Sequence, residues 1–239
     1  MAKVVLVTGG SRGIGAAVCR KFAAEGYTVA INYEKSEEKA KALADEIGGR
    51  AFRADVSDYA EVSKMFSEIE AQLGGVSVLV NNAAVSVVGL FQDMTESEWE
   101  RLFGVNVKGV FNCAKRAVGN MLGEQSGSIV NLSSMWGVTG GSCEAHYSAA
   151  KAAVIGYTKA LAKELGPSGI RVNCVAPGTV ATEMNAHLSK EDLDALAEET
   201  PLGRIGTPEE IAEAVFFLAS EKASFITGEV LNVNGGFVI

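Results

Sequence analysis

The sequence of 239 residues predicts an α/β fold in which one doubly wound parallel sheet is flanked by helices. Short β-branched runs alternate with stretches of helical periodicity along the chain, as expected for right-handed crossovers between parallel strands. The first run, residues 3–8, shows no polar alternation, which is typical of a strand buried on both faces. A glycine-rich turn then leads into the first helical stretch. No linker, low-complexity tract or internal repeat interrupts the pattern, so residues 1–239 are expected to form a single domain.

The composition supports this class and excludes several others. Hydrophobic residues make up 48% and charged residues 21%, which indicates a soluble globular protein with a substantial core. No apolar run is long enough for a membrane span, and the apolar run in MAKVVLVTGG is too brief for a signal-peptide core and is expected to be the first strand. A net charge of −8 argues against a nucleic-acid partner. Four scattered cysteines indicate reduced thiols and therefore a cytoplasmic location, and two histidines are too few for a metal site.

The first half of the chain is predicted to contain four strands, at residues 3–8, 27–33, 50–54 and 76–80. Three helices separate them. Gly26 closes the helix over residues 16–25, and Ser36 caps a helix that ends at Gly48-Gly49. Ser57-Asp58 begins the third helix, whose apolar stripe runs to Leu73.

The second half repeats this alternation. One helical stretch is expected from about Glu96 to Leu122 and another from about His146 to Leu165. Thr207-Pro208 has the cap and first-turn proline of a helix start, and Ile211, Val215 and Leu218 would face inward from that helix. Strands are expected at residues 127–133, 170–175 and 229–233, and Pro177-Gly178 breaks the second of these.

The first turn has the glycines of a phosphate-binding loop. Gly9, Gly13 and Gly15 lie between the first strand and the first helix, where backbone amides can bind a pyrophosphate and glycine permits close approach. The spacing GxxxGxG differs from the common GxGxxG, so the turn alone is a weak signal. Its position between a strand and a helix favours a dinucleotide cofactor.

The end of the second strand bears on which dinucleotide is bound. NAD-binding folds usually place an acid there, whereas this chain has Asn32-Tyr33. Arg12 in the glycine loop could pair with a 2′-phosphate. These residues favour NADP(H) over NAD(H), while Glu34, one residue further on, leaves NAD(H) open.

The candidate catalytic pair is Tyr147 and Lys151, which lie one turn apart on the same helix face. A free tyrosine titrates near ~10, and a cation ~4 Å away at an effective dielectric of ~20 contributes roughly 4 kcal/mol, at most ~3 pKa units. Lys151 is therefore expected to bring the phenol towards the working range of a proton donor, while a nicotinamide carries hydride. Ser134, after the strand at residues 127–133, could donate a hydrogen bond to the substrate oxygen, and Ser133 is its rival.

Residues 183–203 are expected to cover the substrate. This segment follows the Pro-Gly turn and contains a helix start at Ser189. An acyl or other apolar substrate could contact its apolar side chains. A solvated connecting helix with one packed stripe is the alternative. The apolar residues concerned are Met184, Leu188, Leu193 and Leu196.

Taken together and in order, the motifs of this chain resemble those of the short-chain dehydrogenase/reductase family, whose fold is of the Rossmann type. The motifs are Thr8-Gly9 through Gly13-Ile14-Gly15, Asp55-Val56, Asn81-Asn82-Ala83-Ala84, Asn106, Ser134, Tyr147 through Lys151, and Pro177-Gly178. The C-terminal part is most similar to the 3-oxoacyl-[acyl-carrier-protein] reductase branch. Its segments are Pro201-Leu202-Gly203-Arg204, Thr227-Gly228-Glu229 and Val233-Asn234-Gly235-Gly236.

The resemblance implies a role for each matching residue. It selects Ser134 over Ser133, and it gives Lys151 a second task, holding the nicotinamide ribose. Asn106 would hold a water that relays protons to Lys151, although an amide that bridges backbone stays open as the alternative. Asp55 and Val56 would lie near the adenine, Asn82 would steady the fourth strand, and Thr182 would reach the carboxamide. The catalytic set is Asn106, Ser134, Tyr147 and Lys151; the cofactor contacts are Gly9, Ser11, Arg12, Gly13, Ile14, Gly15, Tyr33, Asp55, Val56, Asn82, Ala83, Tyr147, Lys151, Pro177, Gly178 and Thr182.

The sequence departs from the family pattern in two ways. Ala84 replaces the usual glycine where the backbone passes close to the cofactor, which we expect the site to tolerate. Gln125 and Ser168 stand where related carrier-protein reductases tend to have basic residues, so docking of an acidic acyl carrier protein is left open.

The function expected first is NADPH-dependent reduction of a 3-oxoacyl thioester. The alternative is an NAD(P)-dependent enzyme acting on another secondary alcohol, sugar, steroid or xenobiotic ketone. A regulator that only binds the cofactor is disfavoured, because Tyr147 and Lys151 are both kept. The resemblance also implies a homotetramer, since the long fifth and sixth helices of the family usually pair.

Overall fold

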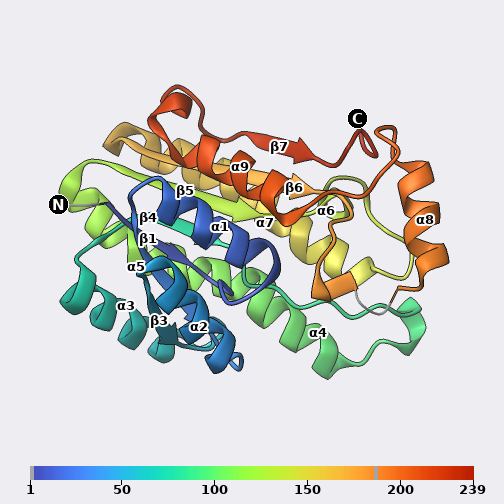
Figure 1. The fold of residues 1–239 in the computed structure, drawn as a ribbon, viewed down its shortest axis with the longest axis horizontal. Coiled ribbons are helices and arrows are strands. Elements are labelled where there is room, and N and C mark those ends of the chain that lie inside the picture. The colour runs from blue at the N-terminus through green and yellow to red at the C-terminus, as the bar shows by residue number, and fades with distance from the viewer. Residues whose placement is uncertain (1–2, 186–187) are drawn as a thin grey trace.

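The computed structural model describes residues 3–185 and 188–239, and in this part of the chain seven parallel strands form one sheet. The strand order is β3-β2-β1-β4-β5-β6-β7, with helices on both faces (Figure 1). This arrangement confirms the predicted fold class. The strands are β1 Val4–Val7, β2 Thr28–Tyr33, β3 Arg50–Arg53, β4 Val76–Asn81, β5 Gly127–Leu132, β6 Ile170–Pro177 and β7 Val230–Val233.

The helices divide between the two faces of the sheet. Buried side chains of α1 (Gly13–Ala24), α2 (Glu37–Ile47) and α9 (Pro208–Ala219) form one core cluster with the strands. Those of α3 (Tyr59–Leu73), α5 (Gly109–Glu124) and α7 (Ala145–Leu165) form a second cluster on the opposite face. The remaining helices are α4 Glu96–Phe103, α6 Met135–Thr139 and α8 Lys190–Glu199, with short helical turns at Phe91–Asp93, Gly166–Ser168, Glu183–Asn185 and Glu221–Ala223.

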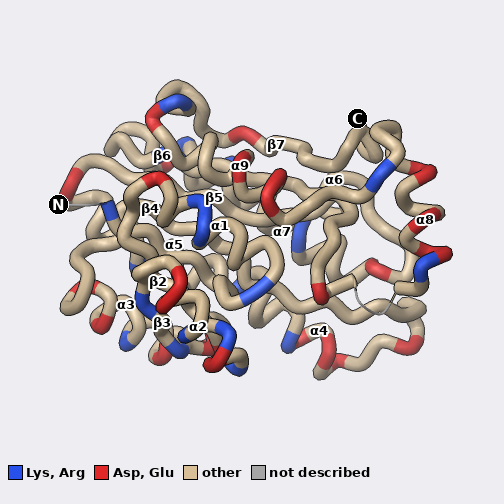
Figure 2. Tube along the Cα trace, viewed as in Figure 1, with Lys and Arg blue, Asp and Glu red and all other residues tan. Residues whose placement is uncertain are grey.

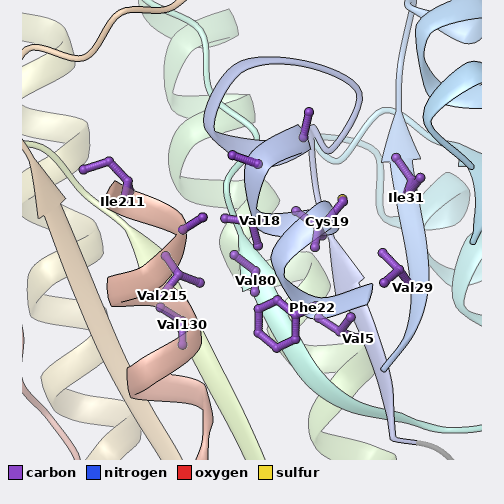
Figure 3. Close-up of a cluster of buried hydrophobic side chains, with 14 of the residues drawn as sticks. Val5, Val18, Cys19, Phe22, Val29, Ile31, Val80, Val130, Ile211 and Val215 are labelled. Carbon is purple, nitrogen blue, oxygen red and sulfur yellow. The ribbon is translucent and has the colours of Figure 1, made fainter. Parts of the chain in front are cut away.

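The first cluster shows why the strands are continuously apolar. Phe22 of α1 is fully buried against Val5, Val80 and neighbouring side chains of the sheet (Figure 3). Its ring also meets Tyr27 and Phe216 edge-on, with centroid distances of 5.0 and 5.3 Å. Charged residues are concentrated on the outer helices and loops, and the central strands are almost free of them (Figure 2). None of the helices in residues 3–185 and 188–239 is both long and apolar enough to cross a membrane.

The helical stretch expected from about Glu96 to Leu122 is confirmed, and it contains a π turn at Gly104–Lys108 between α4 and α5. Directly after Ser134 the chain forms the short helix α6, because the Ser134 hydroxyl accepts a hydrogen bond from Trp136 N at 3.2 Å and caps that helix.

The strand order places the glycine loop beside the candidate catalytic residues. The order reverses between β1 and β4, and ligands of open α/β sheets bind outside the carboxyl ends of the strands at such a point. The glycine loop follows β1, Asn82 follows β4, Ser134 follows β5 and Gly178 follows β6. Residues far apart in the sequence therefore meet along one edge of the sheet.

Candidate active site

Ser134, Tyr147 and Lys151 line one cavity of about 450 Å³. Ser134 is fixed by its place at the start of α6, while Tyr147 and Lys151 lie one turn apart near the start of α7. The Ser134 hydroxyl and the Tyr147 phenol are hydrogen bonded to each other. The structure thus brings together three of the four predicted catalytic side chains.

Ser133, the alternative to Ser134 as the catalytic serine, is hydrogen bonded to the backbone. Its hydroxyl donates to the Lys151 carbonyl oxygen at 2.8 Å, and the residue is buried. The two consecutive hydroxyls therefore have different tasks, since Ser133 joins β5 to α7 and Ser134 contacts the phenol.

Lys151 is buried, and its ammonium donates a hydrogen bond to the Leu132 carbonyl oxygen at 2.8 Å. Its Nζ lies 5.5 Å from the centre of the Tyr147 ring. Burial lowers the pKa of Lys151 from 10.5 to about 8, and the nearby Cys174 opposes this change. Lys151 is therefore predominantly a cation at neutral pH.

The pKa of Tyr147 corrects one sequence-based expectation. Burial raises it above its ordinary value, the Glu144 carboxylate raises it further, and the hydrogen bond with Ser134 lowers it only in part. Lys151 does not bring the phenol towards neutral pH in the protein alone, because its ammonium is directed to Leu132. Tyr147 is accordingly protonated at neutral pH, which is the form of a proton donor.

Asn106, the fourth predicted catalytic residue, lies in the π turn and is buried. Its amide nitrogen donates to the Val85 carbonyl oxygen, and its amide oxygen accepts from Val85 N, both at 2.9 Å. The side chain thus bridges the backbone, which was the alternative to a proton relay. It holds the loop after β4 in place. The water-holding role stays a prediction.

The glycine loop lines a second cavity of about 510 Å³. Gly9 has φ +60°, and a Cβ there would lie 2.9 Å from the Ala83 Cα. A Cβ on Gly15 would lie 2.4 Å from the Gly9 carbonyl oxygen. Among the described residues, no side chain caps the amino end of α1, so its first N–H groups are available to an anion. These features fit the pyrophosphate of a dinucleotide.

Side chains beyond the glycines hold the loop in shape. Asn82 donates to the carbonyl oxygens of Thr8 and Gly9 at 2.9 and 3.1 Å. Asn32 accepts from Gly9 N at 3.2 Å and donates to Ala54 O at 3.1 Å. Asn82, which was expected to steady the fourth strand, thus anchors the glycine loop. Asn32 was predicted only to stand in place of the usual acid.

The predicted cofactor contacts divide between the two cavities. Gly9, Ser11, Arg12, Gly13, Gly15, Tyr33, Asp55, Val56 and Ala83 line the glycine-loop cavity. Tyr147, Lys151, Pro177 and Gly178 line the Ser134 cavity. Residues shared by both are Ile14, Asn82, Ala84, Ser86, Thr182 and Met184. A bound dinucleotide could therefore extend from one cavity into the other.

An ion-pair group that the sequence did not predict lines the glycine-loop cavity. Arg101, from α4, lies 2.8 Å from a Glu34 oxygen and 2.7 Å from an Asp55 oxygen. Burial acts to raise the pKa of Asp55, but hydrogen bonds from Ser57 and Arg101 outweigh it and lower the pKa below its ordinary value. Arg101 thus offsets the charge of both acids.

Glu144 is the residue that sequence reasoning missed in the Ser134 cavity. It directly precedes α7, lines the cavity and accepts a hydrogen bond from the Ser86 hydroxyl at 3.1 Å. An acid three residues before a candidate catalytic tyrosine, at the start of a helix, is a signal that could have identified it. Arg101, in contrast, is 67 residues from Glu34, so no spacing pointed to that pair.

Part of the predicted cover segment reaches the cavities. Met184 lines both of them, and Asn185 lines the Ser134 cavity. Leu188, Leu193 and Leu196 are not among the described residues that line either cavity. Ala186 and His187, within the same segment, lie outside the described residues.

Comparisons with known proteins agree with this geometry. A family model described as enoyl-(acyl carrier protein) reductase matches residues 9–238. The chain is 46% identical over 241 residues to a 3-oxoacyl-[acyl-carrier-protein] reductase of Staphylococcus aureus, covering 99% of this chain and 98% of the relative. It is 44% identical over 237 residues to an acetoacetyl-CoA reductase of Rhizobium meliloti, with coverage of 99% and 98%. A 3-oxoacyl-[acyl-carrier-protein] reductase of Aquifex aeolicus is 45% identical over 240 residues, with coverage of 98% and 96%.

Proposed function

The chain belongs to the short-chain dehydrogenase/reductase family, and we propose that it reduces a 3-oxoacyl thioester to the 3-hydroxyacyl thioester with NADPH. Membership makes it an oxidoreductase that acts on CH–OH groups with a nicotinamide cofactor. The observation that carries the proposal is that the cavity of Ser134, Tyr147 and Lys151 shares its walls with the glycine-loop cavity.

A nicotinamide held between the two cavities would be the source of the hydride that the carbonyl carbon needs. The chain supplies the rest: Ser134 donates a hydrogen bond to the carbonyl oxygen, and Tyr147 gives its phenolic proton to that oxygen as negative charge develops. The phenolate that remains lies beside the Lys151 ammonium, whose Nζ is 5.5 Å from the ring centre.

The preference for NADPH is supported by the charges around the glycine-loop cavity. Glu34 is the acid that could grip a ribose hydroxyl or repel a 2′-phosphate, and Arg101 pairs with it at 2.8 Å. Arg12, which also lines this cavity, is a cation that can bind a phosphate through two parallel hydrogen bonds. Arg101 thus offsets the negative charge of Glu34, and Arg12 is a cation that could bind the 2′-phosphate.

The relatives at 44–46% identity are named for 3-oxoacyl groups on acyl carrier protein and for acetoacetyl-CoA, which are both 3-oxoacyl thioesters. A coenzyme A thioester is the second candidate substrate. Gln125 is exposed, with its amide donating to Leu122 O in its own helix, and Ser168 carries no charge. A carrier protein with an acidic surface therefore has no cation to meet at these two positions.

We also propose a homotetramer. Phe111 and Leu122 on α5 are 44% and 40% exposed, and Phe225 is fully exposed. Apolar side chains at these positions are suited to contacts between copies of the chain.

Initial rates with matched substrates test the proposed reaction. A 3-oxoacyl-CoA, the corresponding carrier-protein thioester and a simple ketone of equal chain length would each be offered with NADPH and with NADH. We expect both thioesters to be reduced faster than the ketone, and NADPH to be preferred. Reduction of the simple ketone alone would contradict the thioester proposal.

Replacement of Tyr147 tests the chemistry separately. Tyr147→Phe should lower turnover by at least about 100-fold, the usual contribution of a general acid, while NADPH binding changes little. Tyr157→Phe, on the same helix, is the matched control and should retain activity. Activity that survives Tyr147→Phe would remove the phenol from the mechanism.

A further inference from the structure

One carboxylate is held between two cations at the rim of the glycine-loop cavity. Glu183, directly after Thr182, has one oxygen 3.2 Å from the Arg12 guanidinium and the other 2.6 Å from the Lys39 ammonium. Arg12 belongs to the glycine loop, Lys39 to the first turn of α2 and Glu183 to the short helical turn after β6. Two cations separated in sequence thus converge on one small anionic group.

The position of this anion coincides with the part of the cavity where an adenosine phosphate is expected. Arg12, Glu183, Tyr33 and Ser36 all line the cavity, so the anion lies between the glycine loop and the carboxyl end of β2. Folds of this kind recognise the ribose 2′ substituent at that end of the second strand. A guanidinium fork and an ammonium are the side chains that bind phosphate most strongly.

The contacts of Glu183 are of a kind that a phosphate can replace. All three side chains are more than half exposed, with Arg12 at 58% and Lys39 and Glu183 at 53% each. Exposed ion pairs of this type contribute little to stability, because water and salt screen them. A phosphate monoester carries about −1.5 to −2 charges and three acceptor oxygens at neutral pH, compared with one charge and two oxygens for a carboxylate. It should therefore compete successfully for both cations.

Other charges nearby do not oppose this exchange. Glu37, in the same turn as Lys39, lies 2.7 Å from Lys41, and Glu34 is paired with Arg101. The hydrogen bond from Lys39 is the main cause that lowers the pKa of Glu183, with Arg12 contributing in the same direction. Glu183 is therefore a carboxylate at neutral pH.

We propose that Lys39 and Arg12 together bind the 2′-phosphate of NADPH, and that Glu183 occupies this phosphate position until the phosphate displaces it. The assignment of Lys39 and Glu183 rests on the proposed use of NADPH. One consequence concerns the substrate cavity. Displacing Glu183 frees the start of the cover segment from the glycine loop, and the adjacent Met184 lines both cavities. NADH, which lacks the phosphate, leaves the Glu183 contacts in place.

Dissociation constants for NADPH and NADH, measured by fluorescence titration of the full chain without substrate, test the proposal. Lys39→Gln should raise the dissociation constant of NADPH by about tenfold, because one charge-assisted hydrogen bond is lost. The dissociation constant of NADH should change by less than about twofold. Glu183→Gln should have the opposite effect and lower the dissociation constant of NADPH by about three- to fivefold, because the competing charge is removed. Lys159→Gln, which removes an exposed lysine on α7, is the control and should leave the ratio of the two constants unchanged.

Hydrogen exchange gives a second, independent result. Amides of residues 183–185 should exchange faster with NADPH bound than with NADH bound, and this difference should disappear in Glu183→Gln. An unchanged NADPH/NADH ratio in both Lys39→Gln and Glu183→Gln would overturn the proposal, even if the wild-type protein reduces thioesters with NADPH. Failure to reduce any 3-oxoacyl thioester would instead overturn the proposed function, while the binding constants would still decide the roles of Lys39 and Glu183.

Discussion

Replacement of Lys151 by methionine is expected to stabilise the folded protein at neutral pH while it abolishes turnover. Lys151 is a buried ammonium whose pKa burial lowers from 10.5 to about 8. This gap corresponds to roughly 3 kcal/mol of unfavourable free energy for the charged form in the folded state. Methionine fills a similar volume without charge, but it also loses the hydrogen bond to Leu132, worth about 1 kcal/mol. The expected net gain at pH 7 is therefore about 2 kcal/mol.

The pH dependence of the stability difference shows whether the buried charge of Lys151 causes it. Lys151 titrates near 10.5 in the unfolded chain and near 8 in the folded protein, so between these values the unfolded state binds more protons. Wild-type stability therefore rises with pH in this window and is lowest, as far as Lys151 is concerned, below pH 8. By pH 9.5 the wild type should have regained roughly 2 kcal/mol relative to Lys151→Met, which nearly removes the difference.

Urea unfolding of the two proteins without cofactor, followed by circular dichroism at pH 7 and pH 9.5, measures this effect. Lys159→Met, at an exposed position on the same helix, controls for the loss of a surface charge and should change stability by less than about 0.5 kcal/mol. A Lys151→Met protein that is no more stable than wild type at pH 7 would refute the reasoning. So would a difference that stays constant between the two pH values.

Three further replacements test other parts of the structure. Arg101→Gln should lower the preference for NADPH over NADH by roughly fivefold, because Glu34 loses its 2.8 Å ion pair; the same loss in a Glu34→Gln background would show that Glu34 is not the reason. Glu144→Gln removes a carboxylate that raises the pKa of Tyr147, so the pH profile of kcat/KM for alcohol oxidation should move to lower pH, and an unchanged profile would contradict this. Phe22→Ala, at a fully buried position, should lower the free energy of unfolding by about 3–5 kcal/mol in urea titrations, and a loss below about 1 kcal/mol would mean that the site collapses around the cavity.

Much of the fold could be predicted because its strands are buried on both faces. The run at β1 must be apolar at every position, since α1 and α9 cover one face and α3 and α5 the other. The π turn at Gly104–Lys108 had no comparable signal. Its residues are compatible with a continuous helix, and only the contact of Asn106 with the Val85 backbone, which depends on the tertiary structure, accounts for a polar side chain at that point.

The site could be predicted where its residues lie within one motif, and not where they meet across the fold. The pair Tyr147 and Lys151 follows from helical spacing, and the glycine loop from its place between a strand and a helix. Lys39 and Glu183 are 144 residues apart, so the sequence contains no spacing that joins them. The pKa of Tyr147 was predicted in the wrong direction, because burial depends on all the elements packed around a group.

The π turn sets the rotational phase of everything that follows it in α5. Each residue of an α-helix turns the chain by about 100°, so forcing residues 104–108 into regular α-helix, with no residue removed, would rotate α5 by about that angle. Cys113, Ala117 and Met121, now fully buried under the sheet, would turn towards solvent. A sequence with better local helix geometry would thus be a worse sequence for this fold. The π turn accommodates one extra residue, so that one face of α5 packs on the sheet while Asn106 stays against the loop after β4.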